Sequence, residues 1–151
     1  MNMMGINKKR KDKKLIIIAG CGRLGSSIAS MFSKHGKDVV IIDKNAVSFR
    51  KLSPDYSGFL IEADATDINT LKDADINNAN IVMALTDNDN VNIMIAQIAK
   101  KIFDVPEVVT RLYDTDKESV ISDSNIYTIN PARLSIAAIE EILAAVREVE
   151  L

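Results

Sequence analysis

A glycine-rich string at residues 20–25 restricts the possible folds of this 151-residue chain more than any other feature. Its sequence, GCGRLG, follows a continuous apolar run at residues 15–19 (LIIIA) and precedes a segment whose apolar residues have helical spacing. An uninterrupted β-branched run indicates a strand that is buried on both faces, as in a parallel sheet covered by helices. The string therefore predicts a tight turn between a central strand and a helix.

The rest of the chain repeats this alternation of strand and helix. Further strands are predicted at 39–42, 59–62, 81–85, 108–112 and 126–129, with helices after residue 24, near 46–52, after residue 67 and over 91–102. Short connections between such elements indicate right-handed crossovers and a parallel sheet covered on both faces. We predict an α/β fold of the Rossmann type, a doubly wound parallel sheet of about six strands in the order 3-2-1-4-5-6.

The glycine string and one acidic residue predict a binding site. In this context Gly20 makes the tight turn, Gly22 lets a pyrophosphate approach the backbone, and Gly25 lets the helix pack closely on the sheet. The N-terminus of the following helix favours negative charge, because its unpaired N–H groups and its dipole face the phosphates. Asp43 ends the second strand, where a carboxylate accepts hydrogen bonds from ribose hydroxyls and repels a 2′-phosphate. The sequence therefore favours NAD or another adenosine ligand over NADP.

Several segments in combination resemble RCK (KTN or TrkA-N) domains. These segments are the glycine string with its arginine, DK at 43–44, EADATD at 62–67, ALTDND at 84–89, and Arg111 at the end of the fifth predicted strand. That family includes cytosolic regulatory subunits of Trk and Ktr potassium transporters and the gating rings of potassium channels. The resemblance implies a regulatory subunit, not an enzyme, that binds NAD or NADH, or alternatively ATP, ADP or AMP, and acts on a membrane potassium transporter or channel.

The resemblance also implies roles for individual residues. The glycine loop with Arg23 holds phosphates, Asp43 with Lys44 holds the ribose, and residues 64–66 flank the adenine. The loop after the fourth strand reaches a second ribose or a terminal phosphate, and Arg111 points to the same region. The complete predicted set is Gly20, Cys21, Gly22, Arg23, Leu24, Gly25, Asp43, Lys44, Asp64, Ala65, Thr66, Leu85, Thr86, Asp87, Asn88 and Arg111. Helix N-capping is the competing interpretation for Asp64, Asp67, Asp87 and Asp89.

The C-terminal segment indicates assembly. Pro131 suits the first turn of a helix that Asn130 caps, and apolar residues cover most of the circumference of this helix, predicted at about 131–150. Packing one face of this helix on the sheet of its own domain would leave apolar surface uncovered. We therefore expect the remaining apolar surface to pack on a second copy, in a homodimer or a larger ring. The resemblance identifies this helix as a crossover at the dimer contact. Residues 15–151 then form one lobe, without the second ligand-binding lobe of full RCK subunits.

Composition argues against several partners. Nineteen basic and 21 acidic residues give a formal net charge of −2, so no positive field attracts nucleic acid or an anionic membrane. No apolar run approaches the roughly 20 residues of a membrane-spanning helix. We expect no membrane insertion and a cytoplasmic protein that reaches the inner face of the membrane through its partner. Residues 1–14 are predicted to be a disordered basic tail, with a docking arm for a membrane partner as the alternative.

The sequence leaves other interpretations open. Tyr113 and Lys117 have the Y-x-x-x-K spacing of short-chain dehydrogenases, although Tyr113 directly follows a predicted strand. A small NAD-dependent oxidoreductase is therefore one alternative, and an interaction module that binds no ligand is another. Cys21, the single cysteine, lies beside a helix N-terminus, which lowers a thiol pKa, so a redox-sensitive thiol competes with a small residue that only fills the loop. No transition-metal site is predicted.

Overall fold

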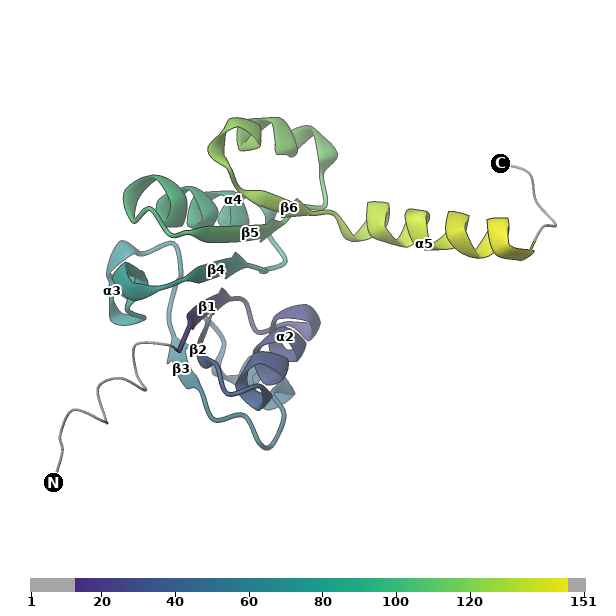
Figure 1. Ribbon diagram of the computed structural model, residues 1–151. Coiled ribbons are helices and arrows are strands. Elements are labelled where there is room, and N and C mark those ends of the chain that lie inside the picture. Colours follow the sequence, from purple (N-terminus) through teal and green to yellow (C-terminus); the bar gives the residue numbers. More distant parts are fainter. Residues whose placement is uncertain (1–12, 147–151) are drawn as a thin grey trace, which may run out of the picture.

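A computed structural model describes residues 13–146, which form one six-stranded sheet flanked by helices (Figure 1). The strands are β1 (Leu15–Ala19), β2 (Asp38–Asp43), β3 (Phe59–Glu62), β4 (Ile81–Ala84), β5 (Glu107–Arg111) and β6 (Tyr127–Ile129). They are all parallel and lie in the order β3-β2-β1-β4-β5-β6. The predicted fold class and strand order are confirmed. The predicted tail at 1–14 falls almost entirely outside the described residues, as do the last residues of the predicted helix at 131–150.

The central strand β1 is buried on both faces, as its β-branched sequence predicts. Ile17 is in register with Val40 of β2 and Val82 of β4, and these three side chains belong to one apolar cluster. The neighbouring side chains of Ile16 and Ile18 point to the opposite face and join a second cluster. Because strand side chains alternate between faces, a strand that is apolar at every position must have helices on both sides.

The helices divide between the two faces of the sheet. One face is covered by α2 (Arg23–Lys34) and the 3-10 helix η1 (Ala46–Lys51). The other is covered by α3 (Ile68–Asp73), η2 (Ile76–Asn78), α4 (Asp89–Gln97) and the π-helical turn η3 (Ile98–Ile102). Two short 3-10 helices that the sequence did not predict, η4 (Thr115–Val120) and η5 (Ser122–Ser124), connect β5 to β6. No helix within residues 13–146 is long and apolar enough to cross a membrane.

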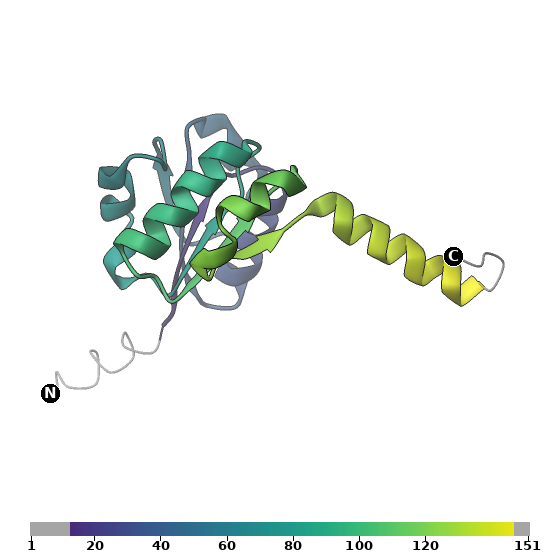
Figure 2. The same ribbon diagram turned by 90° about the horizontal axis from the view of Figure 1, so that it is seen from above.

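The last helix, α5 (Pro131–Val146), contradicts one expectation, because it does not lie on its own sheet. Asn130 caps it as predicted, since its Oδ1 accepts a hydrogen bond from the backbone N–H of Arg133 at 3.1 Å. None of its residues is buried, and both views show it extending away from the domain (Figures 1 and 2). The chain leaves the edge strand β6 and continues outward, so no described element of the domain covers the helix. Most of its apolar side chains are exposed.

Candidate functional site

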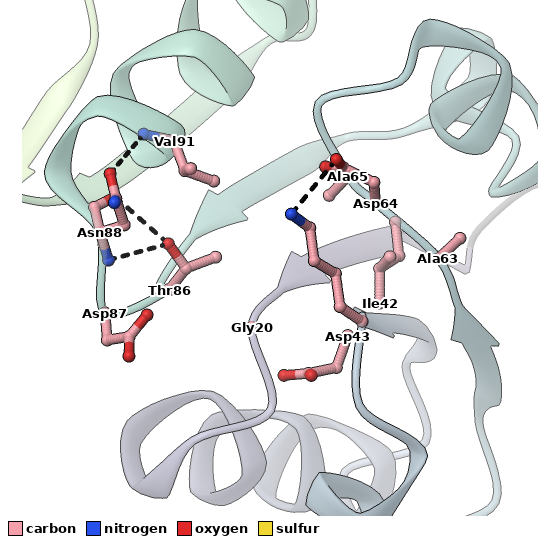
Figure 3. A pocket seen from close by; sticks show the side chains of 11 residues that line it. Gly20, Ile42, Asp43, Ala63, Asp64, Ala65, Thr86, Asp87, Asn88 and Val91 are labelled. Atoms are coloured by element: carbon pink, nitrogen blue, oxygen red, sulfur yellow. Dashed lines mark hydrogen bonds and ion pairs between the residues drawn. The ribbon is translucent and has the colours of Figure 1, made fainter.

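A cavity of about 320 Å³ opens at the carboxyl ends of the strands, on both sides of Gly20 (Figure 3). This is where the strand order reverses between β1 and β4, the position at which open α/β sheets bind ligands. Figure 3 shows Asp43 and Asp64 on one wall and Thr86, Asp87 and Asn88 on the other. The residues that line it are Gly20, Ile42, Asp43, Lys44, Ala63, Asp64, Ala65, Thr86, Asp87, Asn88 and Val91.

The glycine loop fits tightly between β1, β4 and α2. Gly20 has a φ of +102°, and a Cβ at this position would lie 2.8 Å from backbone atoms of Leu85 and Thr86. A Cβ on Gly25 would lie 1.8 Å from the carbonyl oxygen of Gly20, so only glycine lets α2 begin this close to the sheet. A Cβ on Gly22, in contrast, would meet no atom within 4 Å. Folding therefore requires glycine at two positions of the string, and the third faces open space.

Asp43 connects the end of β2 to the glycine loop. Its Oδ2 accepts a hydrogen bond from the backbone N–H of Cys21 at 2.8 Å, and its Oδ1 accepts one from that of Asn45, also at 2.8 Å. An ionised carboxylate has about four acceptor sites, so two remain for hydroxyl groups of a ligand. The residue that the sequence predicts to bind ribose therefore lines the cavity and also fixes the shape of the loop.

Asp64, after β3, is held by three contacts. Its Oδ1 accepts hydrogen bonds from the hydroxyl of Thr66 at 2.7 Å and from the backbone N–H of Thr66 at 2.9 Å. Its Oδ2 lies 3.3 Å from Nζ of Lys44 in an exposed ion pair. The Thr66 hydroxyl, then the Thr66 N–H and to a smaller degree Lys44, lower the pKa of Asp64 below its ordinary value. The carboxylate is therefore ionised at neutral pH and holds the Lys44 side chain at the cavity.

The opposite wall is the loop between β4 and α4. Asn88 is the N-cap of α4, because its Oδ1 accepts a hydrogen bond from the N–H of Val91 at 3.1 Å. Asp87 is exposed and Asp89 is buried, and neither caps the helix, so the capping interpretation is wrong for these two residues. Asp67 does cap α3, since it accepts a hydrogen bond from the N–H of Asn69 at 2.8 Å. Asp64 lies before α3 without capping it.

Half of the predicted site residues line the cavity, and the others lie around it. Arg23 opens α2 and is exposed, whereas Arg111 points its Nη2 at the carbonyl oxygens of Leu85 and Thr86, at 3.0 and 2.9 Å. The guanidinium of Arg111 also lies 5.2 Å from the centre of the Tyr113 ring. The predicted residues that do not line the cavity are Cys21, Gly22, Arg23, Leu24, Gly25, Thr66, Leu85 and Arg111. Their contacts with a ligand stay predictions.

Three lining residues, Ile42, Ala63 and Val91, were not predicted. They are apolar, so their residue types carry no chemical signal. Their positions do, because Ile42 and Ala63 lie beside predicted site residues at the ends of β2 and β3. Val91 lies in the first turn of α4, at the first apolar position of the predicted helix.

Cys21 is buried inside the glycine loop and does not line the cavity. Its Sγ donates a hydrogen bond to the carbonyl oxygen of Ser48 at 3.3 Å. Burial, together with the nearby charge of Asp43, raises the pKa of the thiol to about 11. The thiol is therefore protonated at neutral pH, which favours the loop-filling role over a redox-sensitive thiol.

A second hollow, of about 930 Å³, lies at the opposite end of the sheet. Residues at the starts of strands line it, among them Leu15, Asp38 and Phe59, and it contains none of the predicted site residues. Ligands of parallel sheets bind at the carboxyl ends of strands, so the smaller cavity is the candidate site. Among the described residues, no group of three or more histidine, cysteine, aspartate or glutamate side chains is arranged to hold a metal ion.

Comparison with known proteins identifies relatives in potassium transport. The chain is 35% identical over 118 residues to the Trk system potassium uptake protein TrkA of Streptomyces coelicolor, which covers 78% of this chain and 53% of that protein. It is 39% identical over 108 residues to a TrkA homolog of Pyrococcus horikoshii, over 72% of this chain and 47% of that protein. The chain thus spans about half the length of these relatives.

Solved structures share the fold at lower sequence identity. The GsuK channel bound to NAD superposes with a TM-score of 0.73 at 21% identity, over 88% of this chain and 24% of that one. GsuK bound to ADP superposes with a TM-score of 0.71 at 21% identity, over 86% of this chain and 34% of that one. The Kef CTD of Shewanella denitrificans in its AMP-bound form superposes with a TM-score of 0.68 at 19% identity, over 89% of this chain and 84% of that one. At these identities the likeness concerns the fold alone.

A family model gives the same assignment along most of the sequence. The model described as "TrkA-N domain" matches residues 16–131. This range contains all six strands except the first residue of β1. The match contains the glycine loop, Asp43, Asp64 and the loop after β4. This agrees with the resemblance that the sequence motifs indicated, and the chain therefore belongs to the TrkA-N domain family.

Proposed function

We propose that this chain is a nucleotide-sensing domain of a potassium-transport system, which binds NAD(H) or an adenine nucleotide and regulates a membrane partner. The observation that carries the proposal is the convergence of Gly20, Asp43, Asp64 and the Thr86–Asn88 loop on one cavity. Its volume of about 320 Å³ is at the lower end of the range for small-molecule sites, roughly 300–1,000 Å³. The open face of the cavity leaves room for a ligand that extends beyond it.

The charges around the cavity favour NAD(H), ATP, ADP or AMP over NADP. Three carboxylates line it, those of Asp43, Asp64 and Asp87, with Lys44 as the lining cation. Asp43 offers acceptors to unmodified ribose hydroxyls but repels a 2′-phosphate. The phosphates of any of these ligands would lie at the N-terminus of α2, where Arg23 is exposed. Solved proteins of this fold that are bound to NAD, ADP and AMP support the same ligand class.

The proposed membrane partner is a potassium transporter or channel subunit, with this chain on its cytoplasmic side. Relatives that are Trk system potassium uptake proteins support this proposal. A cell that lacks its own Trk regulatory protein tests it. Expression of this chain together with its cognate transporter should restore growth at low potassium, whereas unchanged growth would count against a role in potassium uptake.

We propose that a second copy of the chain covers α5. The exposed fractions of Leu134, Ile139 and Ile142 are 60%, 55% and 61%, which is high for large apolar side chains along one helix. Light scattering should report a dimer or a larger ring. Ile139→Glu places a charge in this surface and should yield monomers, while Glu140→Gln, at an exposed neighbouring position, should leave the assembly unchanged.

Isothermal titration of the purified chain with NAD, NADH, ATP, ADP, AMP and NADP tests ligand sensing. Binding of at least one of the first five, with NADP clearly weaker, is the expected result. Equal affinity for NADP would show that Asp43 does not contact the ribose. Binding of none would favour the interaction module that needs no ligand.

The oxidoreductase alternative has little support in the geometry. Its motif requires Tyr113 and Lys117 on successive turns of one α-helix, but Tyr113 lies after β5 and Lys117 lies in the 3-10 helix η4. Neither residue lines the cavity. Oxidation of bound NADH by a carbonyl compound would nevertheless establish an enzyme, and absorbance at the NADH wavelength measures it directly.

A further inference from the structure

Partly buried polar contacts connect the candidate site to the helix α4 behind it. Asn92 of α4 is fully buried, and its Oδ1 accepts hydrogen bonds from the backbone N–H of Thr86 at 2.9 Å and from its hydroxyl at 2.6 Å. The Nδ2 of Asn92 donates to the carbonyl oxygen of Thr86 at 3.0 Å. Thr86 lines the cavity, so a single amide side chain holds the backbone and the hydroxyl of a cavity residue in place.

The same side of α4 also holds the end of β5 and the segment that follows it. The Nδ2 of Asn92 donates a second hydrogen bond, to the carbonyl oxygen of Arg111 at 2.8 Å. One turn earlier, the carboxylate of Asp89, which is only 9% exposed, accepts the N–H of Tyr113 at 3.0 Å and that of Asp114 at 2.9 Å. Hydrogen bonds to a carboxylate are stronger than those between neutral groups, so residues 111–114 are firmly attached to α4.

The segment after β5 in turn holds the first turn of α5. Asn130, which is 6% exposed, donates from Nδ2 to the carbonyl oxygen of Tyr113 at 3.3 Å, and its Oδ1 accepts the N–H of Arg133. The guanidinium of Arg133 lies 3.3 Å from the carboxylate of Glu118 in η4. Three links therefore lead from the cavity to α5, through α4, the segment after β5 and Asn130.

The geometry points to Asp89, Asn92 and Asn130 as positioning residues that couple nucleotide binding in the cavity to the orientation of α5. This inference rests on the proposed function, since it requires a ligand that contacts the loop of residues 86–88. Such a ligand restricts Thr86, and the restriction passes through α4 to residues 113–114 and then to the cap of α5. None of the three residues lines the cavity, so they act through Thr86 and not on the ligand.

The shape of α5 makes this coupling effective. The helix has 16 residues and a length of about 24 Å, and none of its residues is buried against the domain. A tilt of about 10° at its base would displace its far end by about 4 Å, since displacement grows with helix length. A small change at Asn130 would therefore alter the placement of whatever packs on the exposed apolar residues of α5. Coupling of this kind is reciprocal, so contacts of α5 would also change nucleotide affinity.

Amide hydrogen exchange followed by nitrogen-15 NMR tests the coupling on the whole chain, without nucleotide and with saturating NADH or ATP. In the native sequence, nucleotide should slow exchange at residues 86–88 and also at the Tyr113, Asp114 and Arg133 amides. The change at Arg133 should be about fivefold or more, the lower end of ordinary coupling between sites.

Two variants and one control separate coupling from folding. Asp89→Asn removes the charge that holds the N–H groups of Tyr113 and Asp114, while Asn130→Ser keeps an oxygen that caps helices but is too short to reach Tyr113. In both variants, nucleotide should still protect residues 86–88 but no longer Arg133. Asp116→Asn makes the same charge change at an exposed position of η4 and should respond as the native sequence does. Should Asp89→Asn unfold, Asn130→Ser carries the test.

Each outcome has a distinct meaning. Protection at 86–88 without any change at Arg133 in the native sequence would overturn the coupling and leave nucleotide binding intact. Persistence of the Arg133 response in a folded Asp89→Asn or Asn130→Ser variant would show that these residues do not transmit it. No response anywhere to either nucleotide would overturn the proposed function, and the coupling with it.

Discussion

The carboxylate of Asp43 accepts a hydrogen bond from the backbone N–H of Cys21 at 2.8 Å, so the end of β2 holds the loop that follows β1. The two strands are adjacent and parallel, which brings the acidic residue of one to the glycine loop of the other. If the Asp43 carboxylate binds the ribose and also shapes the loop that holds the phosphates, it contributes to the binding of two parts of one nucleotide. Its replacement should therefore affect both folding and binding.

Asp43→Ala removes the acceptor for two backbone N–H groups, those of Cys21 and Asn45. We expect the free energy of unfolding to fall by about 1–2 kcal/mol, as for the loss of ordinary hydrogen bonds. Loss of the contacts with ribose should cost roughly a further 1.5–3 kcal/mol of binding free energy, a decrease of about tenfold to over a hundredfold in affinity. Urea denaturation and calorimetric titration measure the two effects separately.

Asp67→Ala provides a matched control for this variant. Asp67 also accepts a backbone N–H, that of Asn69 at the start of α3, but it does not line the cavity. The Asp67→Ala substitution should lower the free energy of unfolding by an amount similar to that for Asp43→Ala, about 1 kcal/mol for a lost N-cap, and leave nucleotide affinity unchanged. An Asp43→Ala variant that binds as tightly as the native chain would refute the assignment of the ribose.

Substitution of alanine at Gly22 and at Gly25 should affect different properties of the chain, nucleotide affinity in the first case and folding in the second. Gly22→Ala places a methyl group where no atom lies within 4 Å, so we expect an intact fold. The same methyl group should obstruct a pyrophosphate that approaches the backbone, and thereby weaken NADH or ATP. Gly25→Ala directs its methyl group to within 1.8 Å of the Gly20 carbonyl oxygen, so it should fold poorly.

Thermal unfolding monitored by circular dichroism, followed by nucleotide titration of the folded variants, distinguishes these effects. The informative case is Gly22→Ala. A variant that melts like the native chain and binds as tightly would place the phosphates away from Gly22. A variant that melts like the native chain but binds weakly would support the phosphate assignment.

The parallel, doubly wound class was predictable because local sequence determined each step, and the strand order followed from the glycine string, which is typical of the Rossmann fold. Continuous β-branched residues in β1 required helices on both faces, and the short connections required parallel crossovers. The orientation of α5 was not predictable in the same way. Its periodicity shows that it needs an apolar partner, but which surface it reaches depends on the path of the chain at Asn130, and residue spacing does not reveal that path.

The site was predictable where residues carry chemistry and lie at strand ends. Gly20, Asp43 and Asp64 meet at the cavity because the carboxyl ends of parallel strands share one edge of the sheet. The support behind the site was not predictable, since Asn92 looks in the sequence like an ordinary polar residue of a helix. Its burial and its contacts with Thr86 depend on how α4 packs against β4 and β5.

The contacts of Asp64 predict a specific dependence on pH. The pKa of Asp64 is lowered from its ordinary value of 3.8, mainly by the hydroxyl and the N–H of Thr66. A carboxyl whose pKa is lower in the folded state stabilises the fold fully above its unfolded pKa, and this contribution is lost as the pH falls through the folded pKa. Thr66→Val removes the hydroxyl and should raise the pKa of Asp64 towards 3.8.

A carbon-13 NMR titration of the Asp64 carboxyl measures this change, and denaturation at several acidic pH values measures its consequence. Lys44→Met is the comparison, because the charge of Lys44 has a smaller effect on Asp64 than Thr66 has. It should move the pKa less than Thr66→Val does. A larger shift in Lys44→Met would show that the ion pair, and not Thr66, controls the ionisation of Asp64.

Cys21 provides a test of the interior of the glycine loop that needs no ligand. Burial, helped by the charge of Asp43, raises the pKa of the thiol to about 11, so only about one molecule in a thousand carries the thiolate at pH 8. Alkylation by iodoacetamide should therefore be slow in the folded chain and accelerate with rising pH well above 8.5, the ordinary value for cysteine. Mass spectrometry of the intact chain follows the reaction, and the same chain in urea shows the rate of the exposed thiol.

Asp43→Asn removes the nearby negative charge and should speed alkylation relative to Asp67→Asn. Rapid labelling of the native chain near pH 7 would instead mean that the loop opens or that the helix N-terminus stabilises the thiolate, and a redox-sensitive thiol would then have to be considered again.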